Sequence, residues 1–205
     1  MNATLYPGIN LGDRHGAAHR EAENKLFGFW IFLMSDLVTF GLFFATYVTM
    51  LGNTAGGPGP GGIFHIGSVA TQTGFLLASS FAMGLAMLEL KYGDARSRLI
   101  LWLGVAGLLG IGFLTFEIRD FLSAIALGAV PSRSGWLSAY FGLVGLHGFH
   151  VCAGTIWLFL LIARVWTGPT TSGVKTRLLR LSLYWHFLDI VWIAIFSVVF
   201  LPGLA

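Results

Sequence analysis

Apolar residues in this chain gather into five long runs that short polar connections separate. Each run holds about 20 residues or more, the length an α-helix needs to cross a bilayer at about 1.5 Å per residue. The period-two alternation of a membrane β-barrel is absent from the sequence. The pattern therefore predicts an all-α integral membrane protein in which a polar tail, residues 1–25, precedes one membrane domain, residues 26–205. Its five transmembrane helices are expected over residues 26–50, 67–89, 99–121, 138–163 and 179–201.

Composition supports a membrane protein. Apolar residues make up 56% of the 205 residues, charged residues only 10%, and the mean hydropathy is +0.78, whereas soluble domains carry about 25% charged residues. The net charge of +3 is scattered between apolar runs, which argues against nucleic-acid binding. The single cysteine, Cys152, cannot form an internal disulfide. The polar first 25 residues hold no apolar core segment, so we do not expect a cleavable signal peptide.

The distribution of basic residues predicts the orientation in the membrane. Ten of the twelve lysines and arginines fall in the N-terminal tail and in the second and fourth connections, including their helix ends. Basic residues favour the cytoplasmic side of a membrane protein. The N-terminus is therefore expected in the cytoplasm and the C-terminus in the periplasm, as an odd number of helices requires.

Among the ionisable residues of the predicted helices, seven are candidates for buried polar contacts: Asp36, Glu117, Asp120, His147, His150, His186 and Asp189. Six of them form pairs at i, i+3, which places both members of each pair on one helix face. An ionisable group that faces lipid at the bilayer centre costs roughly 2.5–3.5 kcal/mol on insertion scales. We therefore expect these faces to turn toward other helices of this chain or of a partner.

The residues themselves leave four interpretations of this set open. Two histidines and an aspartate resemble a metal-ligand set, although the sequence has no HExxH and no cysteine pair. A haem between two histidines needs them on different helices, so His186 would have to pair with His147 or His150. A proton or ion route through Asp36 and Asp189 would fit a transporter, although paired halves are absent from the sequence. The fourth interpretation is a set of hydrogen bonds that fix helix packing or bind a lipid head group.

Three segments carry a family resemblance: "KLFGFWIFLMSDLVTFGLFFATY" (25–47), "GLVGLHGFHVCAGTIWL" (142–158) and "LSLYWHFLDIVWIAIF" (181–196). Together, in this order and spacing, they resemble subunit III of the haem–copper terminal oxidases along nearly the whole chain. The five-helix length and the loop "NTAGGP" (53–58) resemble the cytochrome o ubiquinol oxidase branch. Relatives in the cytochrome c oxidase branch carry two further helices at the N-terminus.

The resemblance implies an accessory subunit in a bacterial inner membrane. In that family subunit III binds no haem, no metal and no other cofactor, and it has no catalytic residue. Two haems and one copper lie in subunit I, which reduces oxygen and pumps protons. Subunit III packs against subunit I, has subunits II and IV as further partners, and holds phospholipid. A cytochrome c oxidase subunit III and a stand-alone transporter remain the alternatives.

By position in this family, Asp36 matches the carboxylate of a Ser-(Asp/Glu) pair, and the three histidines and Asp189 match the histidine and "WHFxD" positions. Asp120 lines up with a membrane glutamate of the cytochrome c branch, so the shorter side chain departs from that pattern. We expect these residues to have structural roles. In particular, we expect Asp189 to accept hydrogen bonds from an adjacent helix, with His147 and His150 as the candidate donors.

Overall fold

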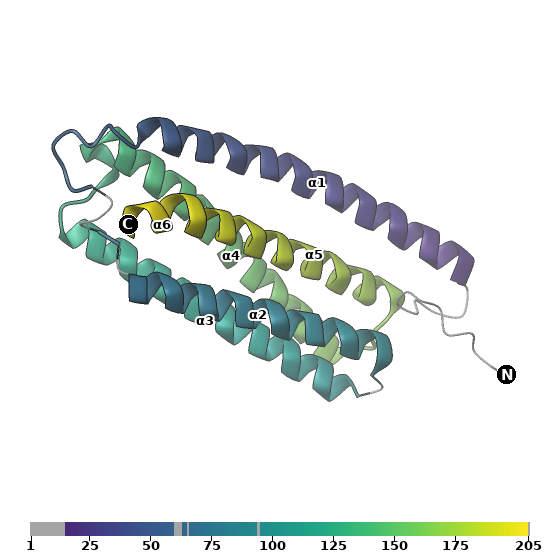
Figure 1. Ribbon diagram of the computed structural model, residues 1–205. Coiled ribbons are helices and arrows are strands. Elements are labelled where there is room, and N and C mark those ends of the chain that lie inside the picture. The colour runs from purple at the N-terminus through teal and green to yellow at the C-terminus, as the bar shows by residue number, and fades with distance from the viewer. Residues whose placement is uncertain (1–14, 60–62, 65, 94, 205) are drawn as a thin grey trace.

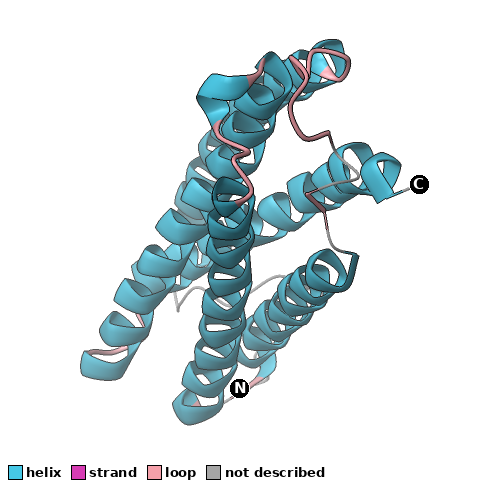
Figure 2. Ribbon diagram, turned by 90° about the vertical axis from the view of Figure 1, so that its left-hand side faces the viewer, coloured by secondary structure: helices cyan, strands magenta, loops and turns pink. Residues whose placement is uncertain are grey.

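The computed structural model describes residues 15–59, 63–64, 66–93 and 95–204, and every regular element within them is helical (Figures 1 and 2). Five helices are long and apolar enough to cross a membrane, which confirms the predicted fold class. A 3-10 turn, η2, precedes α4, while a π-helical turn, η3, and the short α6 continue α5. The bounds are α1 His15–Met50, α2 Ile66–Tyr92, α3 Arg96–Ala126, η2 Pro131–Arg133, α4 Gly135–Thr167, α5 Ser172–Ile195, η3 Phe196–Phe200 and α6 Leu201–Leu204.

Most helix ends lie beyond the predicted spans, most of all the start of α1, whereas α1 ends at Met50 as predicted. This helix begins at His15, so residues 15–25 of the predicted tail are helical, and residues 1–14 lie outside the described part of the chain. Alanine and glutamate in this segment favour a helix, and Lys25 Nζ lies 2.6 Å from Glu21 Oε1 across one turn. The helix is longer than the predicted span because hydropathy marks only the apolar part of a helix, whereas backbone hydrogen bonding continues into the polar region.

The last membrane helix widens near its C-terminal end. Residues Phe196–Phe200 form a π-helical turn directly before Leu201 and Pro202. Proline has no N–H to donate to the carbonyl four residues earlier, and its ring crowds that carbonyl in a regular α-helix. A wider turn gives the ring room without ending the helix, so α5, η3 and α6 together complete one membrane span.

The five long helices alternate in direction, and the two termini lie at opposite ends of the bundle (Figure 1). The start of α1 and the α2–α3 and α4–α5 connections therefore share one end, which carries most of the basic residues. Helix α1 packs against α4 and α5, whereas α2 and α3 pack on each other, with α2 against α5 and α3 against α4. The cytoplasmic placement of the basic end stays a prediction from charge.

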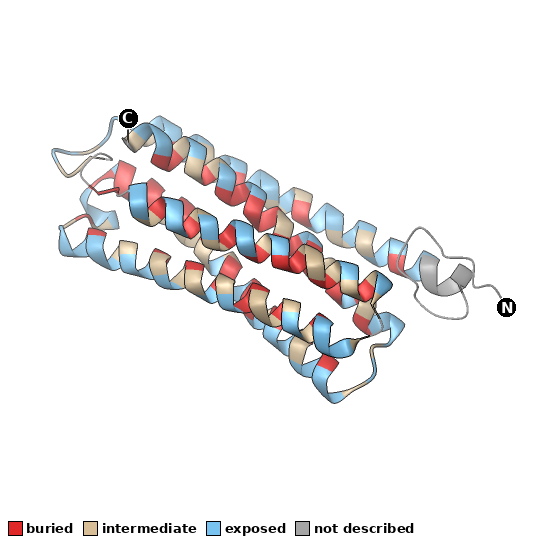
Figure 3. Cartoon of the chain, turned by 60° about the horizontal axis from the view of Figure 1, so that its bottom comes forward, coloured by how far each residue is buried: buried red, intermediate tan, exposed pale blue. Residues whose placement is uncertain are grey.

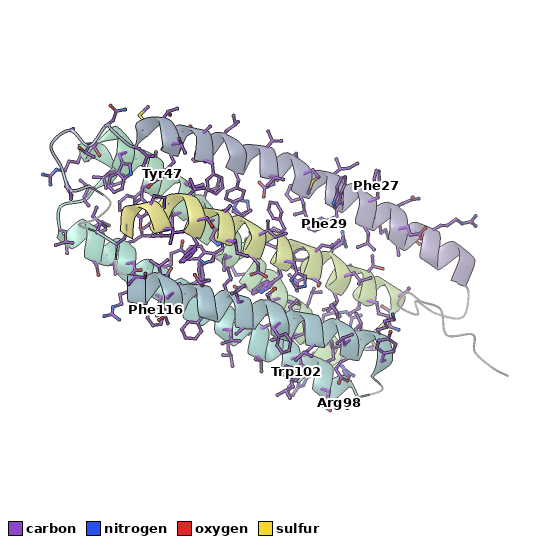
Figure 4. The ribbon with its side chains drawn as sticks, in the orientation of Figure 1. Phe27, Phe29, Tyr47, Arg98, Trp102 and Phe116 are labelled. Atoms are coloured by element: carbon purple, nitrogen blue, oxygen red, sulfur yellow. The ribbon has the colours of Figure 1, made fainter. Side chains whose placement is uncertain are left out.

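Buried side chains follow the inner faces of the helices (Figure 3). On α1 the buried stripe is narrow and includes Leu33, Phe40 and Tyr47 at intervals of seven residues. Phe29 and Tyr47 lie on the inner side of this helix (Figure 4). From Phe27 onward, many of the remaining residues of α1 are exposed and apolar, as expected for a helix in contact with lipid or with another membrane protein.

Candidate functional site

The structure places the seven predicted residues in two regions. Asp36, His147, His150, His186 and Asp189 lie near the middle of α1, α4 and α5, at similar depth in the bundle, and we call these five residues the polar layer. Glu117 and Asp120 lie closer to the C-terminal end of α3. All seven are buried or half-buried in the chain, and 44% of the side chain of His186 is exposed.

Asp36 and His150 join α1 to α4. His150 Nε2 lies 3.3 Å from Asp36 Oδ2, and both side chains are largely shielded. His150 Nδ1 lies 2.7 Å from the carbonyl oxygen of Leu146, and because a carbonyl only accepts, Nδ1 must carry a proton. One further proton, on either Nε2 or the carboxyl group, makes the pair electrically neutral, the form that a low-dielectric interior tolerates. The contact is therefore suited to holding α1 against the bundle.

His147 is fully buried among aromatic rings. Its ring centroid lies 5.4 Å from that of Trp192 and 5.7 Å from that of Phe113. Neither ring nitrogen has a hydrogen-bond partner among the residues that the structure describes. The imidazole thus takes the place of an aromatic packing residue between α3, α4 and α5.

Glu117 fills the space that a glycine on α4 leaves open. Its side chain is buried, and a Cβ atom at Gly148 would lie 2.7 Å from both carboxyl oxygens. Within the described residues neither oxygen has a hydrogen-bond partner. Only glycine at residue 148 lets the carboxyl group of α3 approach the backbone of α4 this closely.

Asp120 turns away from Glu117 and toward α2. Ser68 Oγ donates to its carboxylate at 2.8 Å, and Gln72 Nε2 donates to Oδ2 at 2.5 Å. Charge-assisted hydrogen bonds of this kind are stronger than neutral ones. The two members of this i, i+3 pair therefore serve different helix contacts, although the sequence predicted one shared face.

His186 and Asp189 remain together, as their spacing predicted, and Ser80 of α2 joins them. His186 Nδ1 lies 2.7 Å from Ser80 Oγ and 3.7 Å from Asp189 Oδ2. A hydrolytic triad needs serine and aspartate on opposite ring nitrogens, whereas here both approach Nδ1. The three residues therefore form an interhelical contact and lack the geometry of a nucleophile with its base.

The expected hydrogen bonds from His147 or His150 to Asp189 do not form. His150 turns toward α1 and Asp36, and His147 lies in its aromatic surroundings. The carboxylate oxygens of Asp189 accept no hydrogen bond from any described residue, and their nearest ionisable group is on His186. The hypothesis was wrong because it ignored α1, which supplies the carboxylate that His150 contacts.

Sequence reasoning missed the short polar residues of α2 that bind α5. Trp192 Nε1 donates to Thr73 Oγ1 at 3.1 Å, and Trp185 Nε1 donates to Ser79 Oγ at 3.0 Å. The contact between Ser80 and His186 is a third one of this kind. All three join α2 to α5, two helices that run antiparallel. The signal in the sequence was a set of small polar residues at intervals of about seven in an otherwise apolar run, because such residues hydrogen-bond between membrane helices.

No three histidine, cysteine or acidic side chains lie together in a way that could hold a metal ion, within the part of the chain that the structure describes. The contacts instead join neighbouring helices: α1 to α4, α2 to α3 and α2 to α5. The fold and these contacts define a multi-pass helical membrane protein whose intramembrane polar groups pack its own helices together.

A comparison with known protein families shows which family of membrane proteins the chain belongs to. The sequence model of the family described as "Cytochrome c oxidase subunit III" matches residues 10–204, and the chain belongs to that family. This confirms the resemblance to oxidase subunit III and, with the five apolar helices, makes the chain a multi-pass protein of the bacterial inner membrane.

Individual relatives are similar over nearly the full length. The chain is 47% identical to a Pseudomonas aeruginosa protein named cytochrome bo(3) ubiquinol oxidase subunit 3, over 99% of this chain and 97% of the relative. A Pseudomonas putida protein of the same name is 45% identical over 90% of this chain and 89% of its own length. The quinol oxidase subunit 3 of Bacillus subtilis is 38% identical over 88% of each chain.

Proposed function

We propose that this chain is subunit III of a proton-pumping haem–copper ubiquinol oxidase and that it acts there without catalysing a reaction. The observation that carries the proposal is its near-full-length similarity to proteins named ubiquinol oxidase subunit 3. Proteins named cytochrome c oxidase subunit 3 are also similar, at 38% identity or less. We therefore favour quinol over cytochrome c as the electron donor of the complex.

In this proposal the chain stabilises catalytic subunit I, its main contact, with subunits II and IV as further partners. The two haems and the copper belong to subunit I. The interhelical contacts of Asp36, Asp120 and His186 support a structural role, because each of these groups contacts a polar side chain of a neighbouring helix of the same chain. A bundle cross-linked in this way presents a fixed surface to its partners.

A groove between α1 and α4 supports the expectation of bound phospholipid. It has a volume of about 370 Å³ and is lined mainly by apolar atoms of Leu42, Phe43, Met50 and Ala139. The groove lies where α1 ends and α4 begins, at the end of the bundle opposite the basic residues. An acyl chain matches such a surface, because it fills apolar space without requiring hydrogen bonds.

Purification through a tag on this chain in mild detergent tests the proposal. We expect a larger haem-bearing subunit to copurify, with ubiquinol oxidase activity and a reduced-minus-oxidised haem spectrum. Removal of this chain should leave the haem on the partner and lower activity during sustained turnover. Haem bound to the isolated chain would contradict the non-catalytic role, and a chain that purifies alone would favour the transporter alternative.

A further inference from the structure

A groove on the outer surface of the bundle, between α2 and α5, is not explained by packing within the chain. It has a volume of about 400 Å³. Four large apolar residues and one glycine of α2 form most of its wall, and Ser80 and His186 supply its polar atoms. The lining residues are Leu77, Ser80, Phe81, Gly84, Leu85, Leu88 and His186. We call this surface the α2–α5 groove.

The α2–α5 groove exposes an imidazole at the middle of the membrane. Ser80 lies near the midpoint of α2, about 20 Å from either end at 1.5 Å per residue, and His186 contacts it directly. His186 makes two polar contacts with other described residues, and both use Nδ1 and neither uses Nε2. Because lipid chains offer no hydrogen-bond partner, an imidazole nitrogen that faces them is left unsatisfied.

Hydroxyl groups on the exposed surface of α1 are satisfied within their own helix. On α1, Ser35 Oγ donates to the carbonyl oxygen of Phe32, and Thr46 Oγ1 donates to that of Leu42. These hydroxyl groups can therefore face acyl chains without loss of a hydrogen bond. His186 Nε2 has no such bond. The exposure of this imidazole at mid-membrane depth therefore indicates a partner molecule with a hydrogen-bonding atom.

The shape of the α2–α5 groove fits a helix. Ser80 and Gly84 are one turn apart, and a Cβ atom at Gly84 would have no other atom within 4 Å, so this part of α2 is hollow. Small residues at i, i+4 let two membrane helices approach closely. Leu77, Phe81 and Leu88 project beside the hollow and are all exposed, which gives large side chains for a second helix to pack against.

We propose that the α2–α5 groove binds a transmembrane helix of another subunit of the same oxidase. That helix places a small residue against the hollow at Gly84 and a hydrogen-bonding side chain or carbonyl group against His186 Nε2. Ser80 and Asp189, behind the imidazole, hold its orientation through Nδ1. This inference rests on the proposed function, because it needs an oxidase complex to supply the helix.

Site-specific photo-crosslinking in intact membranes tests the proposal. p-Benzoyl-phenylalanine replaces Phe81, which is 71% exposed in the groove, or Phe149, a matched phenylalanine that is 70% exposed on α4. We expect ultraviolet light to link the Phe81 variant to another oxidase subunit, with several-fold less protein adduct from Phe149. An adduct at Phe81 with lipid or quinone alone, or with a second copy of this chain, would overturn the proposal.

A pair of glycine substitutions gives an independent readout. Gly84→Leu fills the hollow, whereas Gly104→Leu on α3 adds the same side chain at another position where a Cβ has no other atom within 4 Å. We expect Gly84→Leu to lower the partner subunit recovered per tagged chain several-fold and Gly104→Leu to leave it unchanged. Equal recovery with both variants would overturn the inference while leaving the proposed function intact. A wild-type chain that recovers no partner would instead refute the function.

Discussion

A single methyl group added at Gly154 should separate two helices that now touch. A Cβ atom there would lie 2.9 Å from Cε1 and 3.3 Å from Cδ1 of Tyr184, and 3.4 Å from Cζ3 of Trp185. Carbon atoms in contact lie about 3.5–4.0 Å apart, so the Tyr184 ring must move. That ring is tethered, because its hydroxyl group donates to the carbonyl oxygen of His150 at 3.0 Å.

The size of the effect follows from two opposing contributions. Overpacking of a close contact costs about 1–3 kcal/mol, and alanine stabilises a helix interior over glycine by about 0.5–1 kcal/mol. From the midpoints of these two ranges, Gly154→Ala should lower the free energy of unfolding by about 1 kcal/mol, and by about 2.5 kcal/mol at most. Gly145→Ala, on the same helix with no atom within 4 Å of the new Cβ, should raise it slightly.

Unfolding by sodium dodecyl sulfate in mixed micelles, followed by tryptophan fluorescence, measures both variants. The double variant Gly154→Ala with Tyr184→Leu isolates the contact, because the smaller side chain makes room for the methyl group. We expect the double variant to be more stable than the sum of the two single changes predicts. An additive result, or a Gly154→Ala variant as stable as Gly145→Ala, would refute the reasoning.

Three further substitutions test the polar contacts between helices by the same unfolding measurement. Trp185→Phe removes the hydrogen bond to Ser79 and should lower the free energy of unfolding by about 0.5–1.5 kcal/mol. Asp36→Asn removes the carboxyl group that faces His150 and should cost about 1–3 kcal/mol. Asp120→Leu removes the acceptor of two donors of α2, the half-buried Ser68 and the buried Gln72, and should also cost about 1–3 kcal/mol.

Each of these substitutions has an outcome that would count against it. Trp166→Phe, at an exposed tryptophan of α4, is the control for Trp185→Phe and should change stability by less than about 0.5 kcal/mol. If Trp185→Phe lowers the free energy of unfolding no more than this control does, the hydrogen bond between α2 and α5 does not stabilise the protein. Wild-type stability of Asp36→Asn or Asp120→Leu would show that α1 and α2 are held by apolar packing alone.

The fold was predictable because the membrane simplifies the problem. Runs of apolar residues long enough to span the bilayer must become helices, since no water is present to satisfy an unpaired backbone. The five runs and their alternating directions follow from this alone. Helix ends were not predictable from hydropathy: the eleven residues from His15 to Lys25 are polar and nonetheless helical, since helix formation depends on propensity as well as on burial.

The candidate site was predictable in its residues but only partly in its pairs. Contacts within one helix can be predicted from the number of residues between two side chains. The contact between His186 and Asp189 is an example. Contacts between helices depend on which helices are neighbours and on their register, and the pairing of Asp36 with His150 needs both. Spacing misled at Glu117 and Asp120, because residues three apart differ in direction by about 60°, enough to reach two different neighbours.

The packing of α1 against α4 and α5 has a consequence for biosynthesis. α1 is made first, yet the helices it contacts are the last two to leave the ribosome. At about 5–20 residues per second, roughly ten seconds separate the synthesis of Asp36 from that of His150. During that interval the carboxyl group of Asp36 must enter the bilayer without the imidazole that later faces it. Insertion of α1 is therefore the step of biosynthesis at which the chain must rely most on the insertion machinery.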